Sequence, residues 1–180
     1  MTLTYADKDI IRDQIALYAH AVDRRDWTLM DQIFHPDATF GFGPVQGSWR
    51  DFVTQAKAII GSCTATHHQL GQILIAAQGS ETAITETYMT AMHIVPPGYA
   101  LPAVFPDRGE EYAAIIAGRY VDEFVRTGDS WRILKRTGIY DWREFRPIGD
   151  ATLDAVPQSA RGAHDGSDPA SAISRILKAS

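Results

Sequence analysis

The spacing of apolar residues predicts helices in the first third of the chain. Between Ile10 and Val22, apolar residues recur at intervals of three and four, as they do along one face of a helix. Thr4 or Asp7 could cap the start of this helix. The same reasoning predicts two further helices and a short strand between them: about Trp27–Phe34 and Trp49–Ile60 for the helices, and about Ala38–Phe42 for the strand.

After Gly61 the pattern changes from helical to extended. Four segments are rich in Thr, Val, Ile, Tyr and Trp, which favour strands: Thr66–Ala76, Thr82–Val95, Tyr112–Arg126 and Trp131–Phe145. The turn signals Gln78-Gly79-Ser80 and Thr127-Gly128-Asp129 predict antiparallel hairpins. Helices followed by long antiparallel strands indicate an α+β domain with the helices on one face of a curved sheet.

Two regions interrupt or follow this pattern. The segment Pro96–Gly109 contains several prolines and predicts a long loop or lid. Beyond Pro147 the sequence is rich in Gly, Ala, Ser, Asp and Pro, and only the segment from Asp168 to Leu177 predicts another helix. We therefore expect one domain over residues 1–147 and a tail over residues 148–180, which lies across the domain or a partner subunit, or is mobile.

Composition and charge narrow the classes of protein. The chain has 180 residues, of which 45% are hydrophobic and 22% charged, as in an ordinary globular domain. A net charge of -5 without a basic stripe argues against nucleic-acid binding. Cys63 is the single cysteine, so neither an intramolecular disulfide nor a cysteine-based zinc site is possible. No segment approaches membrane-spanning length, and the first residues do not resemble a signal peptide, so we expect a cytoplasmic protein.

A histidine doublet at the start of the first long strand is a candidate for chemistry. Neighbouring strand residues point to opposite faces, so only one of His67 and His68 can face inward. Strict alternation places His68 with Leu70, Gln72 and Leu74, a mixture of apolar and polar side chains that suits a pocket wall. The alternative is a pair of strand-edge histidines that make ordinary hydrogen bonds.

Tyr18 and Asp23 lie near the end of the first helix. Helix C-termini disfavour aspartate because the helix dipole is negative there, so Asp23 either pairs with Arg24 or Arg25 on the surface or has another use. Tyr18 lies about 140° round the helix from Asp23, so the two need not share a face. A carboxylate, an imidazole and a phenol together are suited to moving a proton on and off carbon near neutral pH.

Arg119 and Arg136 fall inside apolar strand segments. A buried guanidinium needs a partner, so each arginine either forms an ion pair within the sheet or binds an anion or carbonyl group in a pocket. Asp122, Glu123 and Asp141 are available as structural partners.

Several aromatic residues are core residues or, if the domain is hollow, line its cavity; Phe40 and Tyr120 are among them. The sequence contains no nucleotide-binding loop, no His-x-His and no His-x-x-x-His pattern. We therefore expect a metal-free mechanism that needs no cofactor.

Five segments in order resemble the SnoaL-like branch of the nuclear transport factor 2-like superfamily. They are Ile10–Phe34, Pro36-Asp37-Ala38, Thr66–Gly71, Gly118–Asp122 and Trp131-Arg132-Ile133. The resemblance implies a cone-shaped α+β barrel, related to the cystatin-like fold, in which a strongly bent antiparallel sheet wraps around N-terminal helices. It also implies a deep apolar cavity and a homodimer or homotrimer formed through the sheet.

Within that superfamily the chain is similar to scytalone dehydratase, bile-acid 7α-dehydratase and hexachlorocyclohexane dehydrochlorinase, which use a His–Asp dyad for metal-free elimination. The resemblance implies that Asp23 is the dyad aspartate, that His68 is the base, and that Tyr18 is the tyrosine of the dehydratases. It also places Arg136 and Gln72 in the substrate pocket.

These features lead to one main hypothesis: a lyase or isomerase that removes a proton from a hydrophobic, ring-containing small molecule. Two alternatives remain, because a fold does not by itself define a function. The chain could be a non-catalytic structural subunit, similar to the β subunits of ring-hydroxylating dioxygenases, or a protein that binds a hydrophobic ligand.

Overall fold

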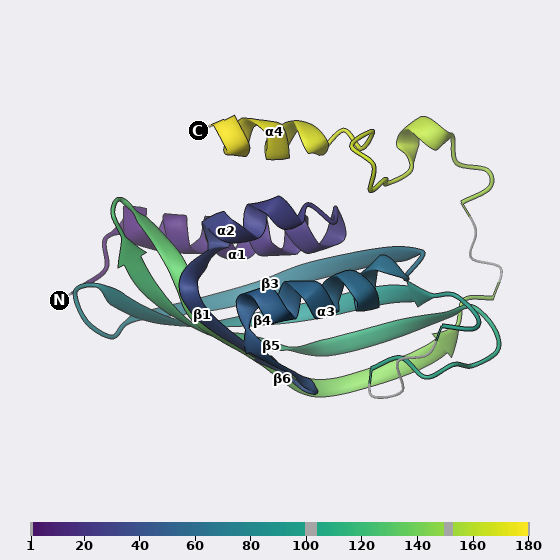
Figure 1. Ribbon diagram of the computed structural model, residues 1–180, viewed down its shortest axis with the longest axis horizontal. Coiled ribbons are helices and arrows are strands. Elements are labelled where there is room, and N and C mark those ends of the chain that lie inside the picture. Colours follow the sequence, from purple (N-terminus) through teal and green to yellow (C-terminus); the bar gives the residue numbers. More distant parts are fainter. Residues whose placement is uncertain (1, 100–103, 150–152, 180) are drawn as a thin grey trace.

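The computed structural model describes residues 2–99, 104–149 and 153–179. In this part of the chain, helices from the first third of the sequence lie on one face of a curved six-stranded sheet (Figure 1). The strand order is β2-β1-β6-β5-β4-β3. The strands are β1 (Phe34–Phe42), β2 (Val45–Ser48), β3 (Ala65–Ala77), β4 (Thr82–Val95), β5 (Tyr112–Thr127) and β6 (Ser130–Pro147).

Helix α1 (Tyr5–Asp23) begins with a capping box that uses both predicted residues. The Thr4 hydroxyl accepts from the backbone NH of Asp7, and the Asp7 carboxylate accepts from the backbone NH of Thr4. This reciprocal arrangement satisfies two of the NH groups that a helix start leaves unpaired. A second capping box, from Ser48 and Asp51, starts helix α3 (Trp49–Gly61).

The predicted second helix occupies the expected segment but is divided into two short elements. It consists of the 3-10 turn η1 (Trp27–Leu29) and the single turn α2 (Met30–Ile33). Strand β1 then starts directly at Phe34, four residues before the predicted strand start at Ala38.

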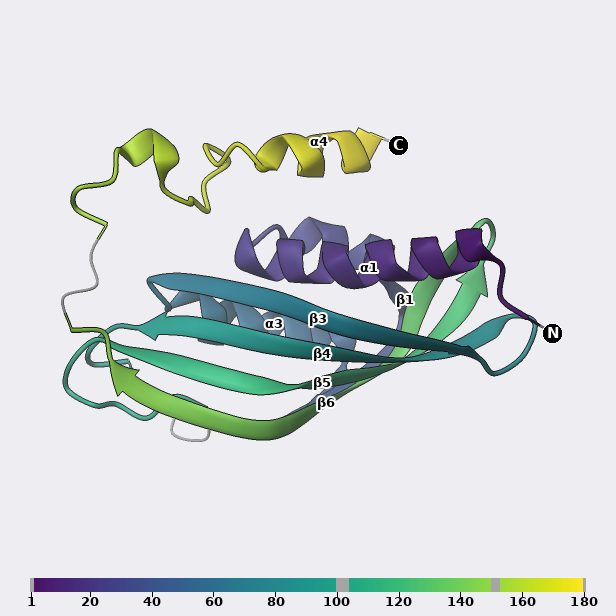
Figure 2. The same ribbon diagram turned by 180° about the vertical axis from the view of Figure 1, so that it is seen from behind.

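The sheet adds two details to the cone-shaped barrel of a strongly bent antiparallel sheet that we expected. β1 pairs with β6 in parallel, whereas the pairs β1–β2, β3–β4, β4–β5 and β5–β6 are antiparallel. β2 and β3 form the two edges, so the sheet is mixed and open. Its curvature still folds around the helices, with the edge strand β3 beside α1 (Figure 2). The α+β class with helices on one face of a bent sheet is confirmed.

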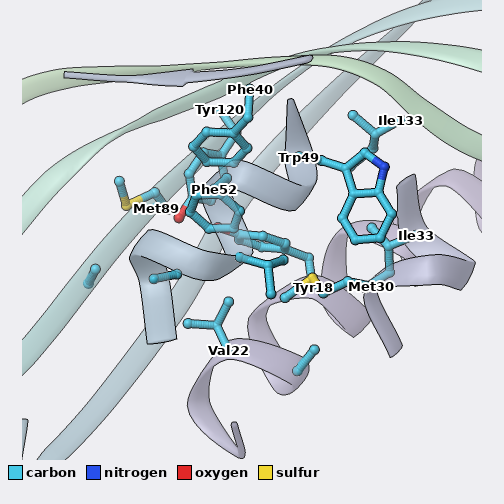
Figure 3. Packing of buried hydrophobic residues seen from close by; sticks show 14 of the residues in the cluster. Tyr18, Val22, Met30, Ile33, Phe40, Trp49, Phe52, Met89, Tyr120 and Ile133 are labelled. Atoms are coloured by element: carbon cyan, nitrogen blue, oxygen red, sulfur yellow. The ribbon is translucent and has the colours of Figure 1, made fainter. Parts of the chain in front are cut away.

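Aromatic rings fill the space between the helices and the sheet (Figure 3). Phe40 of β1 stacks on Phe52 of α3 with ring centroids 3.7 Å apart, and Tyr18 of α1 meets Tyr120 of β5 edge-on at 5.6 Å. Such rings bury large apolar areas and favour these stacked and edge-on geometries. The concave face of the sheet is therefore mostly occupied by side chains.

The C-terminal segment crosses over α1 on the side away from the sheet (Figure 1). It contains the 3-10 turn η2 (Gln158–Ala160) and helix α4 (Ser171–Ala179). Ser174 of α4 lies within hydrogen-bond distance of His20, at 2.8 Å between Oγ and Nε2. None of the helices in the described part of the chain is both long and apolar enough to cross a membrane.

Candidate active site

The last residue of α1 meets the start of β3 in a compact set of hydrogen bonds. Asp23 Oδ1 lies 2.7 Å from His68 Nδ1 and accepts from the Thr66 hydroxyl at 2.9 Å. Asp23 Oδ2 accepts from the backbone NH of His68 at 2.7 Å. The side chains of His68 and Asp23 are 6% and 11% exposed. The aspartate therefore fixes both the backbone and the ring of His68, whereas His67 is exposed.

These bonds determine the charge of Asp23. Burial alone would raise the pKa of Asp23, but the hydrogen bonds from His68 and Thr66 outweigh it and lower that pKa to about 2. Near neutral pH Asp23 is therefore a carboxylate, and it favours the tautomer of His68 in which Nδ1 carries the proton. The other ring nitrogen, Nε2, then keeps its lone pair.

His68 lines a cavity of about 70 Å³ between α3 and the concave face of the sheet. The walls are mainly apolar and aromatic. The lining residues are Tyr18, Phe40, Phe42, Val45, Phe52, Ala56, Ile59, Ile60, His68, Ala91, His93, Val104, Phe105, Ile116, Tyr120 and Tyr140. Val104 and Phe105 come from the segment predicted as a loop or lid, part of which lies outside the described residues.

Two phenols share the cavity with His68. Burial raises the pKa of Tyr18 to about 12 and raises that of Tyr120 well above its usual value, although the nearby guanidinium of Arg136 opposes the shift. Both phenols therefore keep their protons at neutral pH and remain hydrogen-bond donors. Of the residues predicted for the site, the structure brings together Asp23, His68, Tyr18, Phe40 and Tyr120.

Arg136 is placed differently. It is fully buried, and its Nε and Nη2 atoms donate to both carboxylate oxygens of Asp122 at 2.7 Å. Its guanidinium carbon lies 4.0 Å from the ring centroid of Tyr18 and 4.3 Å from that of Tyr120, and Arg136 is not part of the cavity wall. Of the two roles considered for Arg136, the structure shows the ion pair within the sheet. The guanidinium of Arg136 also packs against the rings of both phenols.

The other candidate arginine, Arg119, also forms ion pairs within the sheet. Its partners are Asp141 and Glu86.

Gln72 lies on the opposite face of the sheet, outside the cavity. The expected alternation fails because β3 contains a bulge: Leu70 pairs with Met89 and Ile73 with Thr87, so Gly71 and Gln72 both lie opposite Tyr88. Because of the extra residue, even-numbered side chains face the core before the bulge and odd-numbered side chains face it afterwards. Leu70 faces the core before the bulge, Ile73 and Ile75 face it afterwards, and Leu74 is exposed.

Sequence reasoning did not single out His93, whose ring centroid lies 5.5 Å from that of His68. It is buried in the cavity wall, and burial lowers its pKa to about 3, with the charge of His68 acting in the same direction. Its Nδ1 has no hydrogen-bond partner among the described residues. The alternation along β4 could have revealed it, because His93 shares a face with Ala83, Met89, Ala91 and Val95.

The described ranges contain no group of three or more His, Cys, Asp or Glu side chains that could hold a metal ion. The titratable groups that line the cavity are those of acid–base chemistry: one oriented imidazole, a second imidazole whose pKa is lowered, and phenols.

Comparisons with known proteins agree with this architecture. The uncharacterized protein Rv2910c of Mycobacterium tuberculosis is 27% identical over 135 residues, which cover 73% of this chain and 83% of that protein. A scytalone dehydratase-like protein from Novosphingobium aromaticivorans has a similar structure, with a TM-score of 0.62, 18% identity and coverage of 81% and 95% of the two chains.

Two further structures are similar. The type 2 hexachlorocyclohexane dehydrochlorinase LinA gives a TM-score of 0.65 at 15% identity, with 81% and 91% of the chains covered. A nuclear transport factor 2-like protein from Salmonella enterica gives 0.58 at 18% identity, with 82% and 97% covered. At these identities the likeness shows a shared fold. The profile of the SnoaL-like domain matches residues 4–137, and the chain therefore belongs to the SnoaL-like family.

Proposed function

We propose that this protein is a metal-free lyase or isomerase that removes a proton from carbon in a hydrophobic, ring-containing small molecule. The observation that carries the proposal is the 2.7 Å contact between Asp23 and His68 Nδ1 at the wall of an apolar cavity. This contact leaves Nε2 of His68 as the base, because the lone pair of Nδ1 is not available in that tautomer.

The chemistry follows from the protonation states. His68 Nε2 takes a proton from a carbon next to a carbonyl group, or from the carbon next to the one that carries a leaving hydroxyl. The electrons of the broken C–H bond form a double bond, and Asp23 stabilises the imidazolium that results. Tyr18 or Tyr120 donates a hydrogen bond to the enolate oxygen or to the departing hydroxyl. In an elimination the imidazolium of His68 then gives its proton to that hydroxyl, which leaves as water, and His68 is again a base. In an apolar, enclosed site these fixed donors act more strongly than they would in water.

The cavity limits the substrate in its present form. The cavity volume of about 70 Å³ is well below the usual volume of ligand pockets, which is about 300–1,000 Å³. It is also smaller than the roughly 150 Å³ of an apolar cavity that binds benzene. A ring-containing substrate must therefore displace lining side chains.

The comparisons support this reaction class through their names. The scytalone dehydratase-like protein and the dehydrochlorinase LinA are each named for an elimination, and each shares the fold. A proton acceptor that faces an apolar cavity is the part that such reactions have in common.

The first experiment measures proton removal directly. Small cyclic ketones and ring-bearing β-hydroxy ketones are incubated with the protein in D₂O, and NMR follows deuterium uptake and loss of water. We expect His68→Ala and Asp23→Asn each to lower the rate by about 10²–10⁴-fold, because one removes the base and the other its orienting charge.

His67→Ala is the matched control, because it removes the exposed neighbouring imidazole and should leave the rate unchanged. Thermal unfolding confirms that each variant is folded. Full activity of folded His68→Ala would refute the assignment of the base.

A further inference from the structure

A second pocket lies outside the candidate active site, between the end of α1 and the C-terminal segment. Its volume is about 270 Å³. The residues that line it are Arg24, Arg25, Asp26, His164, Gly166, Ser171, Ser174, Arg175 and Lys178. Two stretches that are more than 130 residues apart in the sequence thus form one pocket, and most of its charged side chains are basic.

The acidic partners in this region neutralise only part of that charge. Arg24 pairs with Asp168 at 2.5 Å, and Lys178 pairs with Asp26 at 2.7 Å. Arg25 and Arg175 have no carboxylate partner within the described ranges. The pocket therefore carries an excess of positive charge on a chain whose net charge is -5.

Arg25 is held in position by two features. Its backbone is left-handed, with φ 56°, which is uncommon for a residue with a side chain. Its Nη2 donates to the Cys63 carbonyl at 2.7 Å, whereas its Nε is buried and has no hydrogen-bond partner in the described part of the chain. A buried donor without a partner costs free energy, and a ligand oxygen would remove that cost.

His164, which also lines the pocket, has a second nitrogen atom that lacks a hydrogen-bond partner among the residues that the structure describes. This atom is its buried Nδ1. An anion beside this ring would favour the protonated imidazole, in which Nδ1 is a donor.

The pocket lies beside the C-terminus of α1, where the helix dipole is negative. The carbonyl groups of His20 and Val22 already accept from the backbone NH groups of Arg24 and Arg25.

We infer that this pocket binds an oxyanion of the phosphate class, held between Arg25 on the turn after α1 and Arg175 on α4. Guanidinium groups present paired donors that match the oxygens of phosphate, so two arginines without acidic partners suit such a ligand. The bound anion links the C-terminal segment to the domain. It can be a free oxyanion or the phosphate group of a larger molecule, and both use the same contacts.

The test is calorimetric titration of the full chain, at low ionic strength, with inorganic phosphate and with phenyl phosphate. We expect saturable binding that weakens as sodium chloride is added, because salt screens exposed charges. Arg25→Gln should weaken binding by about tenfold, since it removes a partly buried charged donor. Arg175→Gln should weaken it by about threefold, since its side chain is exposed.

Arg12→Gln is the matched control, because it removes an exposed arginine of α1 that is paired with Asp9. It should leave the affinity unchanged. Equal affinity for the two ligands supports a site for the free anion, and tighter binding of phenyl phosphate supports the phosphate group of a larger molecule. The absence of saturable binding, or unchanged affinity in both folded pocket variants, would overturn the inference.

Discussion

His93 shows how the site treats two neighbouring imidazoles differently. His68 is bonded to a carboxylate, whereas His93 is buried among apolar side chains and its pKa falls to about 3. Near neutral pH His93 therefore stays uncharged. This matters for the proposed reaction, because a charged His93 would repel the imidazolium that forms on His68.

The neutral state of His93 predicts an acid-labile fold. In the unfolded chain His93 titrates near 6.5, so between about pH 6.5 and 3 the unfolded state binds more protons than the folded state. Stability should then be lost as the pH falls through this window, by up to about 1.4 kcal/mol per pH unit for this one group. Urea unfolding at a series of pH values measures the slope.

His93→Gln is the comparison variant, because it removes the titrating ring and keeps a polar side chain. Its stability should depend less steeply on pH between 6.5 and 4. The lowered pKa of Asp23 acts in a separate window, below about 3.8, where stability is lost as that carboxylate is protonated. Equal slopes for the two proteins above pH 4 would show that His93 is not the titrating group.

The residues of the site were predicted unequally well. Asp23 and His68 were found because helix C-termini disfavour aspartate, because strand alternation turns one histidine of the doublet inward, and because the family resemblance pairs the two. Gln72 was misplaced because alternation cannot detect an extra residue, whose presence depends on the partner strand. His93 was overlooked because a single histidine in an apolar strand gives little signal by itself.

The strands themselves follow the sequence closely, but their pairing does not. The four long strands lie where β-branched and aromatic residues predicted them. The parallel pairing of β1 with β6 joins the two ends of the domain, and local pattern contains no information about it. The same holds for the bulges in β3 and β6, which set the curvature of the sheet.

The bulge between β5 and β6 predicts a specific sensitivity. Ala117 pairs with Trp142 and Gly118 with Tyr140, so Asp141 is the extra residue. A Cβ at Gly118 would lie 2.0 Å from the Ile139 carbonyl oxygen, which is a backbone atom that cannot easily move. We expect Gly118→Ala to lower the free energy of unfolding by about 2–3 kcal/mol or more, measured by urea denaturation.

Gly61→Ala is the matched control. A Cβ at Gly61, at the end of α3, would meet no atom within 4 Å. Alanine also favours a helix over glycine, so this variant should be as stable as the parent or gain roughly 0.5–1 kcal/mol. A tolerated Gly118→Ala would show that the bulge is not held as tightly as this geometry indicates.

The convex face of the sheet carries large apolar side chains that the single chain leaves uncovered. Tyr88 is 41% exposed and Trp142 54% exposed, and Leu74 and Met92 are also exposed. Tyr88 and Trp142 line one groove, whose wall also includes Gly71 and Gly118. Exposed apolar groups gathered in one place usually mark an interaction surface, so we expect two or three copies to associate through this face.

Trp142→Glu should shift the assembly toward the monomer, because a charge replaces a large exposed apolar side chain on that face. Light scattering coupled to size-exclusion chromatography measures the mass. Tyr5→Glu is the control, because it replaces an exposed tyrosine at the start of α1 and should leave the mass unchanged. A parent protein that is monomeric across the concentration range would contradict the expected assembly.

The parallel pairing of Phe34 with Ile133 has a consequence for biosynthesis. A growing polypeptide cannot make this contact before residue 133 has been synthesised. Contacts between distant residues form slowly, since a long loop must close first. Tyr140, on the same late strand, closes part of the cavity wall. Before β6 has been synthesised, the apolar concave surface therefore stays open to chaperones and to other nascent chains, and it becomes a shielded interior only once β6 has joined the sheet.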